Sequence, residues 1–338
     1  QAFLAIRAVC LGARGRANCP HPTAMSSADL DLVRAQLALR PTLKQKLVAH
    51  RGWHRDHAAA AADRPLENTR QAYLDAAALD VAYAECDVWV TRDEQLVLSH
   101  DFNFQAVAED PSQDLATRPI AELRWEELRR LRLRTDCKPV LLLTVLQDLL
   151  PTSTRLAIEL KSSSCAPRLA ACLAERPELS AAVGFVLSFS LGVLEAFAAT
   201  LGRVAADTRL VWIVDNPRVP YSEGGLDEGE TTFDYSAESL PDFLERTGLT
   251  ERVRMLGCGL YLQYNLAVTA QALFELRAAL RSVSSCGMLG LWSDRSLDPG
   301  IDSADALSSL LPALDLANSD LPGAFFGSTG VPQPIQVN

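Results

Sequence analysis

Short apolar runs alternate with segments of helical spacing from about residue 44 onward. The brief apolar runs are typical of strands, and recurrence of apolar residues every three to four positions is typical of helices. The predicted strands cover residues 46–49, 82–90, 96–99, 156–160, 183–188, 210–214, 255–262, 288–292 and 315–318. The predicted helices cover residues 68–79, 121–133, 143–150, 167–174, 192–201, 240–247, 267–280 and 302–311.

This alternation predicts an α/β fold in which helices cover a parallel sheet. There are nine candidate strands, and a (β/α)8 TIM-type barrel takes eight, so one candidate lies outside the barrel or is wrong. A doubly wound open sheet is the main competitor. The chain carries neither the GxGxxG fingerprint nor the Walker P-loop that such sheets often use to bind phosphates. We therefore expect the barrel.

Two histidines close strand-like runs and are each followed directly by a charged residue, as His50-Arg51 and His100-Asp101. In an α/β barrel the C-terminal ends of the strands form the rim of the active site. Histidines at that rim can serve as general acid and general base near neutral pH. The alternative is that both only cap strands or lie in the core. His54 and His57 are interpreted as surface residues.

Carboxylates recur inside two of the apolar runs. Glu85 and Asp87 are two positions apart, so on a strand they point to the same side. Glu159 lies within another predicted strand. Three carboxylates suit a hard divalent cation such as Mg²⁺ or Ca²⁺, which takes oxygen ligands. In the alternative interpretation, Lys161 and Arg51 neutralise these acids in structural salt bridges.

The segment Glu67-Asn68-Thr69 opens the first predicted helix. Taken alone it is typical of a helix start, with Asn68 or Thr69 as the cap and an acid near the positive end of the helix dipole.

Composition narrows the class of protein. The formal net charge of −10 over 338 residues argues against a nucleic-acid partner, since phosphate backbones are bound by an excess of Lys and Arg. The eight cysteines are scattered without a CxxC pair, so most are interpreted as small buried hydrophobes. No apolar run approaches the roughly 20 residues of a transmembrane helix.

Residues 1–28 contain three arginines and no acid, which suits an organelle transit peptide. Upstream or fragmentary sequence before Met25 is the other interpretation. We expect a cytoplasmic protein, or a plastid or mitochondrial one if this segment is a transit peptide. The expected organisation is an N-terminal extension over 1–43, a barrel over 44–325 and a tail over 326–338. The oligomeric state stays open.

Several short segments together resemble the glycerophosphodiester phosphodiesterase family. The clearest matches, in chain order, are His50-Arg51-Gly52, Glu67-Asn68-Thr69, Glu85-Cys86-Asp87-Val88, His100-Asp101 and Glu159-Leu160-Lys161. Weaker matches follow at Ser188-Phe189, Trp292-Ser293 and Ser319-Asp320-Leu321-Pro322. Each segment alone is weakly specific, but their common order and spacing are a strong signal.

The resemblance implies a barrel with a small insertion after the third strand, at about residues 102–155, and the chain adds an acidic surface loop at about 216–236. It also implies a role for each of the matching polar residues. Glu85, Asp87 and Glu159 would hold the metal; His50 and His100 would perform acid–base catalysis; Arg51 and Lys161 would face the phosphate; and Glu67 would belong to the same site.

The implied reaction is metal-dependent hydrolysis of a glycerophosphodiester to glycerol 3-phosphate and an alcohol, through attack by the glycerol's own hydroxyl. A lipid phosphodiesterase acting on lysophospholipid or phosphoinositide is an alternative, favoured by Trp53, Phe102 and Phe104 if they lie near the pocket mouth. A barrel that binds a phosphorylated metabolite without turnover is the alternative of another class. The residues after His100-Asp101 depart from the family pattern, which leaves recognition of the head group open.

Overall fold

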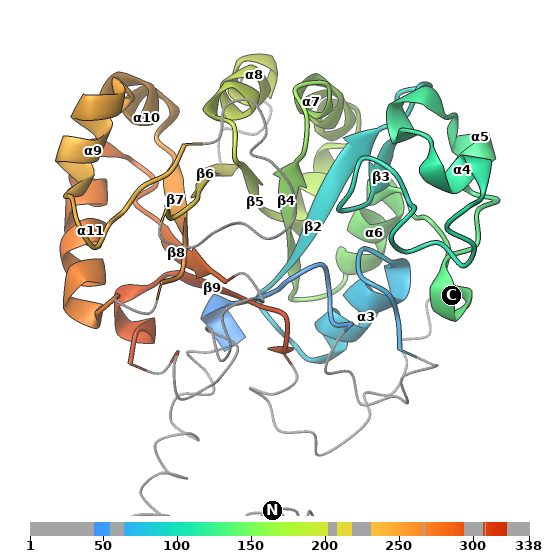
Figure 1. Cartoon of the computed structure of the whole chain (residues 1–338), viewed down its shortest axis with the longest axis horizontal. Coiled ribbons are helices and arrows are strands. Elements are labelled where there is room, and N and C mark those ends of the chain that lie inside the picture. Colours follow the sequence, from blue (N-terminus) through green and yellow to red (C-terminus); the bar gives the residue numbers. More distant parts are fainter. Residues whose placement is uncertain are drawn as a thin grey trace, which may run out of the picture.

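The computed structural model describes residues 44–54, 64–201, 208–217, 231–265, 268–293, 307 and 309–322. Its strands are β1 (Leu47–Ala49), β2 (Tyr83–Val90), β3 (Leu96–Leu98), β4 (Arg155–Leu160), β5 (Val183–Ser188), β6 (Arg209–Val214), β7 (Gly259–Gln263), β8 (Leu289–Trp292) and β9 (Leu316–Ser319). Its longer helices are α3 (Arg70–Ala78), α6 (Leu142–Leu149), α7 (Cys165–Glu175), α8 (Leu191–Leu201), α9 (Leu240–Thr247), α10 (Thr250–Leu256) and α11 (Ala270–Val283). The helices surround the strands (Figure 1).

Eight parallel strands close into a barrel. Their order is β1-β9-β8-β7-β6-β5-β4-β2, and a second pairing joins β1 to β2. The remaining strand, β3, pairs antiparallel with β2 and stays outside the ring. The predicted barrel is therefore confirmed, and the surplus ninth strand is the short hairpin partner of β2.

Side chains alternate between the two faces of each barrel strand and so build two cores. The inner core fills the barrel with Val48, Ala157, Phe185, Leu187, Val211, Ile213, Tyr261, Met288 and Leu316. The outer and larger core lies between strands and helices, with residues such as Leu156, Ile158 and Phe197. Because the interior is packed, a ligand can enter only above this inner layer, at the ends of the strands.

The segment between β3 and β4 carries the predicted insertion. Its short helices are α4 (Asp114–Thr117), η2 (Ile120–Glu122), α5 (Trp125–Leu128) and η3 (Arg134–Asp136). They enclose a separate apolar cluster that runs from Val97 to Leu133. In contrast, α6 packs with α3 and contributes its buried leucines to the outer core. Figure 1 shows α4 and α5 at one side of the barrel.

Two predicted elements have different bounds in the structure. The predicted strand 255–262 begins only at Gly259, because α10 occupies Thr250–Leu256 and ends at Gly257 with a left-handed φ of 58°. The predicted helix 121–133 was wrong as one element, since only the four residues of α5 are α-helical. Leucines of this segment turn into the insertion's own cluster instead of forming one continuous helical stripe.

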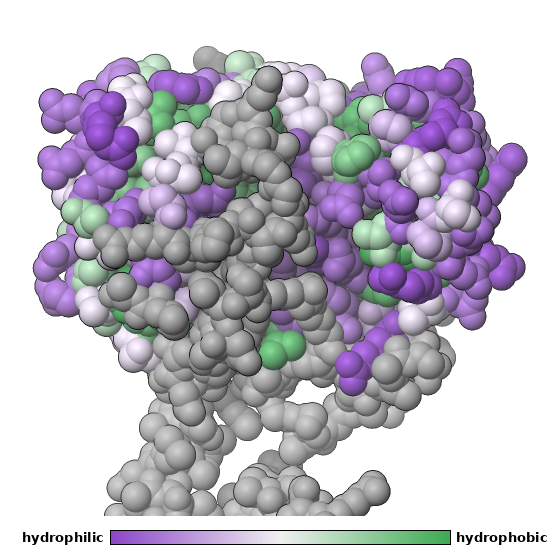
Figure 2. All heavy atoms as spheres, viewed as in Figure 1, coloured by the Kyte–Doolittle hydropathy of each residue, from purple (hydrophilic) through white to green (hydrophobic). Residues whose placement is uncertain are grey.

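Other predictions fall outside the described residues. These are the N-terminal extension over 1–43, the tail over 326–338, most of the loop 216–236 and most of the helix 302–311. Among the residues that the structure describes, no helix combines the length and apolar character needed to cross a bilayer. Hydrophilic residues predominate over the helices at both sides of the face in Figure 2.

Candidate active site

The turn after β1 places two predicted residues at the mouth of the barrel. Arg51 and Gly52 both have a left-handed backbone, with φ of 53° and 82°. The backbone N–H of Arg51 donates to Oε2 of Glu85 at 2.9 Å. A Cβ atom on Gly52 would come within 2.8 Å of Ala72, so only glycine fits this turn against α3. The segment His50-Arg51-Gly52 therefore forms a left-handed turn that holds the Arg51 backbone beside Glu85.

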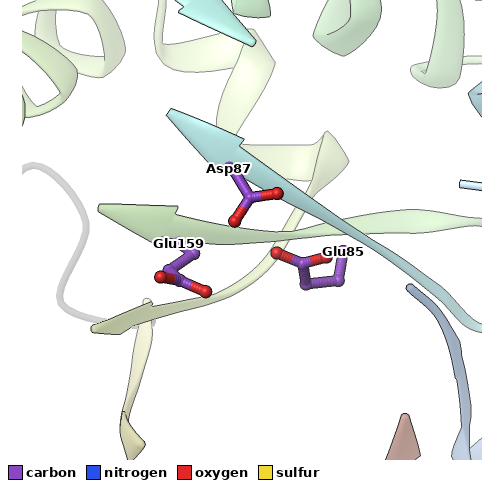
Figure 3. Close-up of side chains that lie close together, drawn as sticks. All are labelled: Glu85, Asp87 and Glu159. Carbon is purple, nitrogen blue, oxygen red and sulfur yellow. The ribbon is translucent and has the colours of Figure 1, made fainter. Parts of the chain in front are cut away.

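The three predicted metal ligands converge. Glu85 and Asp87 project from β2 and Glu159 from the neighbouring β4, where Asp87 and Glu159 are register partners. Figure 3 shows the three carboxyl groups pointing toward one another. One oxygen of each lies within 4.8 Å of the others. All three side chains are buried, with exposed fractions of 2%, 1% and 8%.

This trio fits a hard divalent cation. Oε1 of Glu85 is buried and has no hydrogen-bond partner, which is costly unless another group satisfies it. Burial, together with the negative charges of Asp87 and Glu159, raises the pKa of Glu85 well above its usual range. Oxygen ligands grouped in this way are the donor set that Mg²⁺ and Ca²⁺ prefer.

Two cations lie among the acids. The guanidinium of Arg51 donates to Oε1 of Glu67 at 2.9 Å and lies 3.5 Å from Asp87. Nζ of Lys161 donates to Oε1 of Glu159 at 2.8 Å and lies 3.3 Å from Asp87. The salt bridges considered from the sequence are thus present. Glu67, Glu85, Asp87 and Glu159 nevertheless outnumber these two cations, so the site keeps acidic oxygens that a divalent ion could bind.

Asp87 is the most strongly held of the three acids. Nδ2 of Asn68 donates to Oδ2 of Asp87 at 2.8 Å, and Oδ1 of Asn68 accepts from the hydroxyl of Tyr73 at 2.7 Å. Burial opposes ionisation of Asp87, but Lys161, His100, Arg51 and this hydrogen bond together lower its pKa below the usual range. Asp87 is therefore held ionised.

Of the two residues expected to cap the first helix, Thr69 occupies the N-cap position and Asn68 does not. Asn68 binds Asp87 instead of the helix end, with a φ of 54° that asparagine tolerates better than most residues. Thr69 occupies the N-cap position, but its hydroxyl donates to the carbonyl of Leu66 and makes no cap bond.

His50 and His100 line the same cleft as the acids. Nδ1 of His50 lies 2.7 Å from Oδ1 of Asp320, and its Nε2 lies 3.9 Å from Glu85. Nδ1 of His100 lies 2.9 Å from Oδ1 of Asp101. In both cases a carboxylate holds Nδ1 and leaves Nε2 for other contacts. The structure thus brings the two histidines together, while their catalytic roles stay predictions.

Glu67 joins the site through its hydrogen bond with Arg51. Its second neighbour is His54, whose position was predicted wrongly from the sequence. His54 was interpreted as a surface residue, but it is 8% exposed, and its Nε2 lies 3.9 Å from Oε2 of Glu67. Nδ1 of His54 lies 3.3 Å from the carbonyl oxygen of Gly52. His57 lies outside the described residues.

One part of the cleft wall is largely apolar, and the sequence analysis gave its residues no role in the site. It comprises Leu187, Phe189, Ile213, Tyr261 and Trp292. The rings of Phe189 and Trp292 meet edge to face with centroids 5.8 Å apart. Alternation along β5 to β8 was the available signal, since strand residues facing the barrel interior recur at every second position.

None of the three aromatic residues expected near the mouth lines this cleft. Trp53 is buried in the outer core and Phe104 in the insertion's cluster. Phe102, in contrast, is 54% exposed.

Asp320 and Asn318 are further cleft residues without a predicted role, and both come from the last strand segment.

Comparison with known proteins agrees with this fold. A sequence model described as the glycerophosphoryl diester phosphodiesterase family matches residues 50–198, which include every predicted site residue. No curated protein matches the chain.

Solved structures of low sequence identity share the fold. A glycerophosphodiester phosphodiesterase from Thermotoga maritima has a TM-score of 0.55 at 20% identity, covering 82% of this chain and 96% of that chain. One from Parabacteroides distasonis has a TM-score of 0.53 at 19% identity, covering 83% and 94%. A phosphodiesterase from Oleispira antarctica, solved with the product sn-glycerol-3-phosphate, has a TM-score of 0.56 at 17% identity, covering 86% and 97%.

The sequence match and the shared barrel confirm the resemblance inferred from the motifs. With its matching residues gathered around one cleft, the chain shares the barrel fold of solved glycerophosphodiester phosphodiesterases and matches the glycerophosphoryl diester phosphodiesterase family model over residues 50–198.

Proposed function

We propose that the protein hydrolyses glycerophosphodiesters to glycerol 3-phosphate and an alcohol, in a reaction that depends on a divalent metal and two histidines. The observation that carries this proposal is the convergence of three carboxylates, two cations and two histidines in one cleft. The product bound by the Oleispira antarctica phosphodiesterase supports the choice of substrate class.

The charges in the cleft suit a phosphodiester anion. Glu85, Asp87 and Glu159 would hold Mg²⁺ or Ca²⁺, which when bound polarises phosphoryl oxygens and offsets developing charge. Arg51 can present its planar fork of donors to phosphate oxygens, and Lys161 adds a point charge. Both cations already lie at the cleft beside these acids, so they are available at the position that the phosphate would take.

The two histidines can exchange protons with the reacting oxygens. One histidine takes the proton of a glycerol hydroxyl as that oxygen bonds to phosphorus. The other donates a proton to the departing alcohol oxygen as its bond to phosphorus breaks. Water then opens the cyclic phosphate with the two roles reversed, so both histidines return to their starting states. The carboxylates of Asp320 and Asp101 orient the rings for this exchange.

The test is turnover of glycerophosphocholine with Mg²⁺, with Ca²⁺ and with EDTA. We expect release of glycerol 3-phosphate that stops with EDTA and returns when metal is restored. His50→Ala and His100→Ala should each lower kcat by about 10²-fold or more. Full activity in either variant would refute that histidine's role. Tight binding without turnover in any divalent ion would instead support a binding barrel.

One observation keeps a lipid substrate as the second candidate. The apolar wall that includes Phe189 and Trp292 can contact a hydrocarbon or a bulky head group as well as a small alcohol. Burial of Trp53 and Phe104 removes two of the three residues that had suggested this substrate. Hydrolysis rates on soluble glycerophosphocholine and on micellar lysophosphatidylcholine separate the two, and we expect the soluble substrate to react faster.

A further inference from the structure

Several buried polar atoms of the described residues that line the cleft have no hydrogen-bond partner. Among them are Oε1 of Glu85, the hydroxyl of Tyr261 and Oδ1 of Asn318. The three side chains are 2%, 2% and 8% exposed, and all of them line the cleft. A buried polar atom without a partner costs about 1–3 kcal/mol. Glu85 has the proposed metal to satisfy it, whereas nothing proposed so far accounts for Tyr261 and Asn318.

The position of the Tyr261 ring is enforced by the strand beside it. Tyr261 on β7 pairs with Gly290 on β8, and Gly290 pairs with Leu316 on β9. A Cβ atom on Gly290 would lie 2.2 Å from the Tyr261 ring and 3.0 Å from Cβ of Leu316. The ring therefore lies across β8 toward β9, the strand that also carries Asn318.

The chemistry of these two groups favours a hydroxyl as their partner. The phenol hydroxyl of Tyr261 carries its proton at neutral pH and can donate it in a hydrogen bond. Oδ1 of Asn318 can only accept. A hydroxyl is both acceptor and donor, so one such group can satisfy both partners, while an alkyl group or a bare carboxylate cannot.

Resting on the proposed function, we propose that Tyr261 and Asn318 are specificity-determining residues that bind the glycerol hydroxyl not involved in attack on phosphorus. The attacking hydroxyl must face a histidine and the phosphate, so a free glycerol has one remaining hydroxyl to recognise. The apolar side chains of Leu187, Phe189 and Ile213 offer that hydroxyl no partner. The cleft then accepts phosphodiesters of free glycerol and rejects esters whose matching carbon lacks the hydroxyl.

The kinetic test compares glycerophosphocholine with 2-hydroxypropyl phosphocholine, which keeps the attacking hydroxyl and lacks the other. We expect kcat/KM of the wild type to favour glycerophosphocholine by about 10²-fold, since a site built to bind a hydroxyl rejects the analogue without it. Tyr261→Phe should lower kcat/KM for glycerophosphocholine about tenfold and leave the analogue nearly unchanged. Asn318→Leu should likewise reduce the ratio of kcat/KM between glycerophosphocholine and 2-hydroxypropyl phosphocholine.

Tyr83→Phe is the matched control. The Tyr83 hydroxyl accepts from Arg209 on β6, and its ring packs on Phe185 in the barrel interior, outside the residues that line the cleft. This variant removes the same atom and should keep the wild-type substrate preference. Thermal unfolding checks the fold of each variant, and Tyr261→Phe should melt no lower than the wild type, because it removes an unsatisfied buried hydroxyl.

A binding measurement makes the inference independent of turnover. Calorimetry with glycerol 3-phosphate should show tenfold weaker binding to Tyr261→Phe than to the wild type, whereas 2-hydroxypropyl phosphate should bind both equally. An unchanged substrate preference in Tyr261→Phe, or no difference between the two phosphates, would overturn the inference. If the wild type hydrolyses neither diester, the proposed function fails and the calorimetry still decides the role of Tyr261.

Discussion

Nδ1 of His50 lies 2.7 Å from Oδ1 of Asp320, although 270 positions separate the two residues along the chain. The contact exists because β1 pairs with β9 and so closes the barrel. Asp320 is 5% exposed, so its carboxylate is shielded from water and its bond to the ring is strengthened. Orientation of His50 therefore depends on the last strand of the fold.

We predict that Asp320→Asn lowers kcat by about 10²-fold, because an amide no longer holds the His50 ring in the same tautomer. Asp101→Asn is the matched comparison for His100. Asp101 is 43% exposed and adjacent in sequence, so its replacement should cost less than that of Asp320. Steady-state kinetics on glycerophosphocholine with both variants tests this. Equal losses would show that the buried Asp320 has no special role.

Metal should stabilise the fold as well as permit turnover. At a Mg²⁺ or Ca²⁺ concentration one hundredfold above Kd, the free energy of unfolding should rise by about 2.7 kcal/mol. Glu85→Gln should abolish this rise and leave the metal-free protein at least as stable, because burial and the nearby acids already disfavour the charged form of Glu85. Thermal melts with and without metal test both statements. Glu195→Gln changes an acid paired with Arg252 on the surface and is the control that should keep the metal response.

We predict that replacement of Asn68 lowers the free energy of unfolding. Asn68→Ala leaves the Tyr73 hydroxyl without its acceptor and removes the amide donor from Oδ2 of Asp87, so we expect a loss of about 2–3 kcal/mol in the free energy of unfolding. Tyr73→Phe removes only the hydroxyl and should cost about 1 kcal/mol. Urea denaturation of both variants gives the comparison. A cost for Asn68→Ala no larger than for Tyr73→Phe would argue against the bond to Asp87.

Gly52→Ala should disturb both stability and the site. The new Cβ would lie 2.8 Å from Ala72, and the φ of 82° disfavours a side chain, so we expect a loss of about 2 kcal/mol and a raised KM through displacement of Arg51. Gly192→Ala is the control, because its Cβ would meet only Ser190 Oγ at 3.5 Å. In α8 that change should be neutral or stabilise by up to about 1 kcal/mol.

Much of the site could be predicted because its residues sit on local patterns. Spacing of two positions placed Glu85 and Asp87 on one side of a strand, and strand ends placed His50 and His100 at the barrel rim. The prediction failed where a side chain had a distant partner. The local sequence predicts Asn68 as a helix cap, but its amide donates to Asp87, 19 positions away. His54 was predicted to lie on the surface, but its side chain is buried beside Glu67.

The amino-acid pattern alone determined the alternation of strands and helices, the surplus ninth strand, the three clustered acids and the two histidines, because each follows from spacing within a few residues. The places of Arg51, Lys161 and Glu67 in the site were implied by the family resemblance. Only the tertiary structure decided which strand stays outside the ring, which carboxylate orients His50, and that the Tyr261 ring lies over Gly290. Those facts depend on the register of parallel strands and on ring closure between β1 and β9. Contacts between residues hundreds of positions apart are set by packing of the whole barrel, and no local periodicity encodes them.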